Sequence, residues 1–172
     1  AGEAVSSAGD VDGDGLDDLL IGADDNNDGG TYAGKVYLIL GASLGSTAEI
    51  DLSDADYSFV GEFGDTAGRS VSSAGDVDGD GLDDLLVGAP YNDEGGSYAG
   101  KAYLILGASL GSASEIDLSD ADYSFVSEYS GDNAGYSVSS AGDVDGDGLD
   151  DILVGAYLNG DTGKAYLILS GL

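Results

Sequence analysis

Three stretches of the chain share the sequence DVDGDGLDD, in which aspartates recur at a close and regular spacing. Carboxylates occupy positions 1, 3, 5 and 9 of each stretch, with glycine at position 6 and leucine at position 7. Alternate residues of a tight turn can direct their oxygens at one centre, and glycine permits the bend that a Cβ would obstruct. The predicted metal ligands, with the leucines contributing backbone carbonyls, are Asp10, Asp12, Asp14, Leu16 and Asp18, then Asp76, Asp78, Asp80, Leu82 and Asp84, then Asp143, Asp145, Asp147, Leu149 and Asp151.

Four carboxylates held this close repel one another unless a cation neutralises them. An all-oxygen ligand set suits a hard divalent cation, above all Ca²⁺. The alternative is that these aspartates only decorate polar turns, and the recurrence of one spacing in three places argues against it. Position 12 carries Ile21, Val87 or Val154 in an apolar run, where an EF-hand has a bidentate glutamate. We therefore predict three strand–loop–strand calcium sites per chain.

The aspartates at position 8 of the loops are not in the predicted ligand sets. They are Asp17, Asp83 and Asp150. We expect their side chains to face solvent or to support the turn rather than to contact the metal.

The acidic loops recur because the whole chain is repetitive. The sequence VSSAGDVDGDGLDDLL begins at Val5 and Val71 and returns at Val138 with an isoleucine in place of one leucine, at spacings of 66 and 67 residues. These spacings divide the chain into three predicted units, 1–66, 67–133 and 134–172. The segment EIDLSDADYSFV closes the first two units and is missing from the third.

Short apolar runs separated by Gly, Asp, Asn and Ser predict strands and essentially no helix. In the second unit these runs are Ser70 to Ala74, Asp84 to Ala89, Lys101 to Leu106 and Tyr123 to Val126. Four short strands per repeat are typical of a β-propeller blade, and a solenoid is the competing repeat architecture. We predict an all-β protein of four-stranded antiparallel blades, about three per chain, with the last blade incomplete.

The composition excludes several classes of function. The 172 residues include 34 Asp plus Glu, 4 Lys plus Arg and no His or Cys, for a net charge of -30. This charge repels nucleic acid and anionic lipid, and the apolar runs are too short to cross a bilayer, so we expect neither nucleic-acid binding nor membrane insertion. Serine-protease, cysteine-protease and zinc-hydrolase mechanisms are excluded. A glycosidase that uses two carboxylates is formally open, but the aspartates repeat in every unit, and we expect no enzyme.

The run FGDTAGRSVSSAGDVDGDGLDDLLVGAP, which begins at Phe63, resembles the FG-GAP repeat of integrin alpha-subunit propellers and related bacterial surface proteins. Phe63-Gly64 stands at the FG position and Gly88-Ala89-Pro90 at the GAP position, with the acidic loop between them, where the family binds Ca²⁺. The resemblance covers essentially the whole chain and implies a four-stranded blade whose calcium loop joins its first two strands. The other units depart from the FG and GAP letters but keep the loop aspartates.

Calcium in such loops is expected to have a structural role. Three bound ions would add +6 to a charge of -30, so calcium relieves local rather than overall repulsion. Calcium sites of extracellular modules bind at about 10⁻⁴ to 10⁻³ M, which cytosolic calcium would not fill. Together with the absence of cysteine and the surface character of the family, this indicates a secreted protein that is extracellular or at the cell surface.

We expect a non-enzymatic module for adhesion or protein interaction, or a self-assembling structural module, with Ca²⁺ making each blade rigid. The alternative is a lectin-like propeller, because Tyr32, Tyr91, Tyr98 and Tyr157 lie in or beside loops and could stack on sugars or simply cover strand ends. Propellers have about four to eight blades. The chain is therefore expected to self-associate into a closed ring or a head-to-tail filament, or to pack on neighbouring repeats of a longer array.

Overall fold

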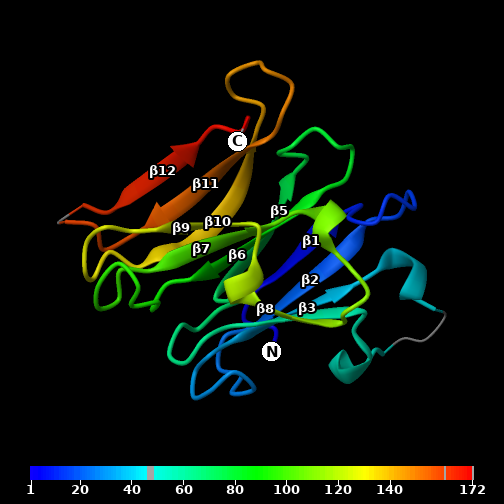
Figure 1. Cartoon of the computed structure of the whole chain (residues 1–172), viewed down its shortest axis with the longest axis horizontal. Coiled ribbons are helices and arrows are strands. Elements are labelled where there is room, and N and C mark those ends of the chain that lie inside the picture. Colours follow the sequence, from blue (N-terminus) through cyan, green and yellow to red (C-terminus); the bar gives the residue numbers. More distant parts are fainter. Residues whose placement is uncertain (46–48, 161, 172) are drawn as a thin grey trace.

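The structure is a computed structural model that describes residues 1–45, 49–160 and 162–171; Leu172, which ends the third predicted unit, lies outside the described residues. Twelve strands in these ranges form three sheets that lie side by side (Figure 1). The strands are β1 (Val5–Gly9), β2 (Asp18–Ala23), β3 (Lys35–Ile39), β4 (Tyr57–Val60), β5 (Ser70–Gly75), β6 (Asp84–Ala89), β7 (Lys101–Ile105), β8 (Glu115–Asp117), β9 (Tyr123–Val126), β10 (Ala134–Gly142), β11 (Asp151–Ala156) and β12 (Lys164–Ile168). The described helical residues form short 3-10 turns, η1 (Gly41–Ser43), η2 (Leu52–Asp54), η3 (Gly107–Ser109) and η4 (Leu118–Asp120).

The three sheets are the predicted blades. The second has the order β5-β6-β7-β9 and the third the order β10-β11-β12, with every neighbouring pair antiparallel. The predicted strands of the second unit end within one residue of the observed ones. The all-β prediction, with four antiparallel strands in a complete blade and an incomplete third blade, is confirmed for the described residues.

The first sheet contains a strand that the sequence did not predict. Its order is β1-β2-β3-β4-β8, and β8 comes from the second unit and pairs with β4 in parallel, with Phe59 opposite Ile116. The matching letters Glu49–Asp51 of the first unit form no strand. The same EID sequence therefore forms a strand only in the second unit, where it pairs with the edge strand β4 of the preceding blade.

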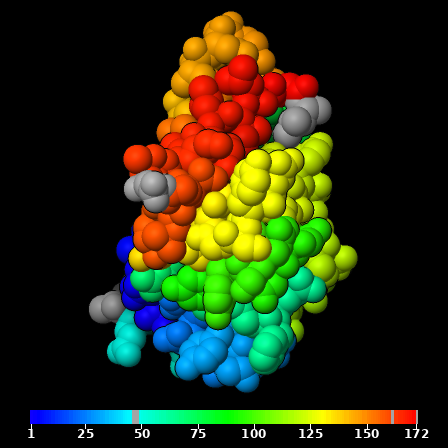
Figure 2. Space-filling model, turned by 90° about the vertical axis from the view of Figure 1, so that its left-hand side faces the viewer, coloured from blue at the N-terminus to red at the C-terminus, as the bar shows by residue number. Residues whose placement is uncertain are grey.

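Each blade packs face to face against the next. The largest core cluster joins Leu20 and Leu38 of the first blade to Leu85 and Val87 of the second, and a further cluster joins the second blade to Ile152 of the third. The middle blade is covered on both faces, and its strands β6 and β7 are buried along their whole length. Figure 2 shows this stacking, with blue to cyan segments at the bottom and orange to red segments at the top.

The loops gather at two opposite edges of the stack. The loops after β1, β5 and β10 project from one edge, at the upper right of Figure 1, and the loops after β2, β6 and β11 project from the other. Within the part of the chain that the structure describes, no helix is long and apolar enough to span a bilayer.

Candidate metal centres

Each acidic loop leaves its first strand through an irregularity in the strand pairing. The register of β5 and β6 shifts between Ser73 and Gly75, and β1 and β10 show the same shift at Gly9 and Gly142. These glycines have φ of 75°, 77° and 67°, a left-handed conformation that disfavours a side chain. The bulge turns the chain out of the sheet, so that the aspartates begin at the next residue.

Three carboxylates of each loop converge. The residues at positions 1, 3 and 9 can place one oxygen each so that all three lie within 4.8 Å of one another. The converging sets are Asp10, Asp12 and Asp18, then Asp76, Asp78 and Asp84, then Asp143, Asp145 and Asp151. Oxygen atoms at this spacing can share one hard cation.

The aspartate at position 1 is fixed by the turn that follows it. Asp76 Oδ2 accepts a hydrogen bond from the amide of Gly81 at 3.0 Å, and its Oδ1 accepts one from Gly79 at 2.7 Å. Gly81 has φ of 91°, which supports the predicted need for glycine at position 6. Asp10 and Asp143 accept the same hydrogen bond from the glycine at position 6 of their own loops.

The aspartate at position 9 is buried and joins the loop to the far end of the blade. Asp84 Oδ2 accepts from the amide of Val77 at 2.9 Å, and Oδ1 accepts from the amide of Gly107, beyond β7, also at 2.9 Å. Asp18 and Asp151 make the equivalent pairs of hydrogen bonds. Each oxygen keeps a second lone pair, so these carboxylates can brace the blade and still face a cation.

The aspartates at position 5 are not part of the converging sets. Asp14, Asp80 and Asp147 instead accept hydrogen bonds from the leucine amides two residues on, at 2.8 to 2.9 Å. This is the Asx-turn geometry that tightens a loop. Ligation by these three aspartates, and by the carbonyls of Leu16, Leu82 and Leu149, remains a prediction.

The aspartate at position 8 has a role that the sequence did not indicate. Asp17 is exposed, as expected, but Asp83 and Asp150 are half-buried and reach the preceding blade. Asp150 Oδ2 accepts from the amide of Asp76 at 3.1 Å, and the amide of Asp150 donates to the carbonyl of Asp76 at 3.0 Å. Only the stacking of blades brings residues 74 positions apart together, so no local signal could have identified this contact.

The electrostatics of the loops suit a cation. Asp10 Oδ1 is buried and has no hydrogen-bond partner among the described residues, which is costly for a carboxylate oxygen. Burial raises the pKa of Asp84 to about 6, and the nearby carboxylates of Asp78 and Asp80 add to the rise. Burial also raises the pKa of Asp18. A divalent ion would supply the missing partner and offset this repulsion, so the residues present fit a calcium ion.

The pKa of Asp151 moves in the opposite direction. Hydrogen bonds from the backbone amides of Ser170 and Val144 lower the pKa of this carboxyl. Among the described residues no blade covers the outer face of the third blade, and Asp151 keeps the hydrogen bonds of Asp84 with less desolvation.

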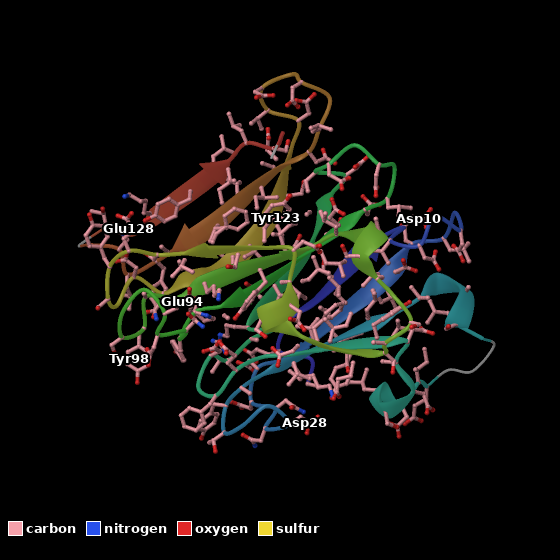
Figure 3. All side chains as sticks on the ribbon, in the orientation of Figure 1. Asp10, Asp28, Glu94, Tyr98, Tyr123 and Glu128 are labelled. Atoms are coloured by element: carbon pink, nitrogen blue, oxygen red, sulfur yellow. The ribbon has the colours of Figure 1, made fainter. Side chains whose placement is uncertain are left out.

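The opposite edge of the stack carries an aromatic hollow of about 520 Å³. Tyr32, Tyr91 and Tyr98 line it together with Phe63 and Arg69, and Tyr91 meets Tyr98 edge to face at 5.5 Å. Figure 3 shows Tyr98 far from Asp10, at the other edge of the sheets. Three of the four loop tyrosines named from the sequence thus line one surface.

The fourth loop tyrosine lies elsewhere. Tyr157 packs on Tyr136 in the third blade, with ring centroids 4.3 Å apart. It belongs to a separate pair and does not line the aromatic hollow.

Comparisons with known proteins agree with the repeat pattern. The FG-GAP repeat model matches residues 1–39, 67–105 and 134–168. The chain is 36% identical over 163 residues to integrin alpha-PS2 of Drosophila melanogaster, a match that covers 86% of this chain and 11% of that protein. It is 31% identical over 167 residues to integrin alpha-4 of Xenopus laevis, with 92% and 14% covered.

A relative with a different name also matches most of the chain. Phosphatidylinositol-glycan-specific phospholipase D of Bos taurus is 32% identical over 168 residues, covering 95% of this chain and 19% of that protein. The chain thus spans 11% to 19% of the length of these relatives. The family match includes all three acidic loops and the strands on both sides of each. This chain belongs to the FG-GAP repeat family.

Proposed function

We propose that each acidic loop binds one Ca²⁺ and that the bound ions make the blades rigid. The observation that carries this proposal is the buried Oδ1 of Asp10, a carboxylate oxygen within a converging set of three that has no hydrogen-bond partner among the described residues. Asp12 and Asp18 would complete the carboxylate ligands of that loop. Asp14 and the Leu16 carbonyl are the further ligands expected from the sequence, and the same roles fall on the equivalent residues of the other loops.

Calcium would act on stability because it binds the folded loop far better than the unfolded chain. At a free concentration ten times the Kd, binding stabilises the fold by about 1.4 kcal/mol per site, or about 4 kcal/mol for three sites. A typical domain has a net stability of about 5 to 15 kcal/mol. The ion would join the end of the first strand to the start of the second, where the aspartates at positions 1 and 9 lie.

Calcium titration with a matched pair of variants tests this proposal. Isothermal titration calorimetry is expected to find three ions per wild-type chain, and Asp78→Ala is expected to leave two. Asp78 is exposed, so its loss should not unfold the protein. Asp25→Ala removes the same charge from an exposed residue outside the three acidic loops and is expected to keep three ions. Loss of an ion in both variants, or in neither, would contradict the assignment.

We propose further that the chain is part of an extracellular or cell-surface module that contacts other proteins and is not itself an enzyme. Two of the relatives described above are integrin alpha chains, and the carboxylates of this chain repeat from blade to blade rather than forming one asymmetric site. The match to a phospholipase D covers 19% of that protein. Contact with other proteins would use the loops at the two edges of the stack.

The aromatic hollow favours carbohydrate binding as a second candidate function. Exposed rings at the edge of a hollow can stack on the apolar faces of sugars, and Tyr32 and Tyr98 come from equivalent loops of successive blades. A glycan-array screen tests this candidate, with Tyr98→Ala as the variant and Tyr129→Ala, an exposed tyrosine outside the hollow, as the control. Absence of any glycan signal that depends on Tyr98 would reject it.

A further inference from the structure

Every blade has two different faces, which can be followed from one blade to the next. On the forward face, Val11, Leu20 and Leu38 of the first blade are 0% to 1% exposed because the second blade covers them. The equivalent residues of the second blade, Val77, Leu86 and Leu104, are 0% to 6% exposed beneath the third blade. The same letters at the forward face of the third blade, Val144, Leu153 and Leu167, are 51%, 37% and 50% exposed.

The rear face shows the reverse order of exposure. Leu85 and Ile152, at the rear of the second and third blades, are 0% and 3% exposed against the blade before them. The equivalent Leu19 of the first blade is 37% exposed, and its neighbour Val5 is 69% exposed, against 8% for the equivalent Val71. Within the part of the chain that the structure describes, the forward face of the third blade and the rear face of the first blade thus lack the cover that their equivalents have.

These two open faces are complementary because the chain already joins such faces twice. Leu82 packs its side chain over Gly13 of the preceding loop, and Leu149 does the same over Gly79. The position 8 aspartates then hydrogen-bond in both directions with the backbone of the preceding loop. The leucine equivalent to Leu82 and Leu149 on the open rear face of the first blade is Leu16. The glycine equivalent to Gly13 and Gly79 on the open forward face of the third blade is Gly146.

We propose that the forward face of the third blade binds the rear face of the first blade of a second copy of this chain, in the register used between blades. Leu16 of the second copy then covers Gly146, and its Asp17 accepts a hydrogen bond from the amide of Asp143. Leu19 and Val5 of the second copy cover Leu153 and Leu167. The contact is head to tail, so repetition of it produces a ring or a filament.

The charge of the chain does not prevent this contact. Each molecule carries a formal charge of -30, but the acidic loops of successive blades already stack within it. At physiological salt the Debye length is about 8 Å, which screens charges outside the contact. The proposed contact is a specific form of the self-association expected from the sequence. It does not involve the residues that line the aromatic hollow.

Sedimentation velocity on variants blocked at one face tests the proposal. Leu167→Glu blocks the forward face and Leu19→Glu the rear face; both residues are partly exposed in one molecule, so both variants should fold. Wild type is expected to form species heavier than the 17.0 kDa chain as its concentration rises to about 0.1 mM, where even a micromolar contact is filled. Each variant alone is expected to stay monomeric, and their mixture to form a dimer that grows no further.

The control is Phe63→Glu, which adds the same charge at an exposed residue outside both faces and is expected to associate like wild type. Circular dichroism checks that each variant is folded, and Val5→Glu replaces Leu19→Glu if that variant is not. Wild type that stays monomeric throughout overturns the proposal. So does a single-face variant that still dimerises, because a symmetric contact between like faces would then explain the mass.

Calcium stoichiometry is measured on the same samples. A monomer that binds three ions overturns the head-to-tail contact and leaves the calcium proposal intact. Association by a chain that binds no ion supports the contact and rejects the calcium proposal.

Discussion

The carboxylate of Asp83 accepts a hydrogen bond from the backbone amide of Asp10 at 2.8 Å, so the second acidic loop holds the first. The amide of Asp83 in turn donates to the carbonyl of Asp10 at 3.1 Å. Asp150 and Asp76 repeat the pair one blade further on. A residue beside one candidate metal centre therefore orients the first ligand of its neighbour, and the centres are mechanically connected.

Replacing Asp83 should loosen the contact between the first two blades. Asp83→Ala leaves the amide of Asp10 without its acceptor and is expected to lower the free energy of unfolding by about 1 to 3 kcal/mol. Asp17→Ala is the matched control, because Asp17 holds the same loop position but is exposed and should change stability by at most about 0.5 kcal/mol. Urea unfolding in calcium, at concentrations where the chain is monomeric, measures both, and equal effects would contradict the bridging role of Asp83.

The glycine before each loop offers a second matched pair. A Cβ at Gly75 would overlap the carboxylate of Asp150, whereas a Cβ at Gly142 would meet nothing within 4 Å. Both residues have positive φ, so alanine costs about 1 to 2 kcal/mol of backbone strain at either site. Gly75→Ala is expected to be the more destabilising in thermal unfolding because it also displaces Asp150. A Gly142→Ala variant that is equally unstable would show that backbone strain alone matters.

The stability of the metal-free protein should depend on the ionisation of Asp84. Its folded pKa, about 6, lies above its ordinary value of 3.8, so folding favours the protonated carboxyl. The stability from this group is fully present below pH 3.8 and is lost as the pH rises through 6, a change of about 3 kcal/mol. Asp151 behaves oppositely, since its lowered pKa gives stability that is lost as the pH falls.

Carboxyl ¹³C NMR can follow these two residues separately. Without divalent ions, Asp84 is expected to titrate near pH 6 and Asp151 below 3.8. Saturating calcium should lower the titration midpoint of Asp84, because the ion binds the carboxylate and not the acid. Midpoints that coincide in the metal-free protein would refute the effect assigned to burial.

Two identical segments test the energetic effect of stacking. The sequence KAYLI forms both β7 and β12, and its leucine is Leu104 in the buried copy and Leu167 in the open copy. Leu104→Ala is expected to cost about 2 to 5 kcal/mol, the usual range for a buried leucine. Leu167→Ala should cost much less at concentrations where the chain is monomeric. Chemical unfolding of both variants measures the difference, and similar losses would mean that the third blade is covered in solution.

The sequence alone determined the parts of this protein that depend on short-range order. The short apolar runs, and the Gly, Asp, Asn and Ser residues that separate them, predicted β5, β6, β7 and β9 of the second unit to within one residue. The spacing of the loop aspartates identified every member of the converging carboxylate sets. These features could be read because β pairing between adjacent strands and Asx turns involves neighbours in the chain.

Only the tertiary structure decided what identical sequences do in different places. Asp83 and Asp17 share a loop position, but Asp83 accepts a hydrogen bond from the preceding blade whereas Asp17 is exposed. The EID segment becomes β8 in one unit and remains irregular in the other. Burial, hydrogen bonding across blades and the pKa of Asp84 all depend on which surfaces are covered. In a repetitive chain, the position of a blade in the stack decides which of its surfaces are covered, because the blades have nearly the same sequence.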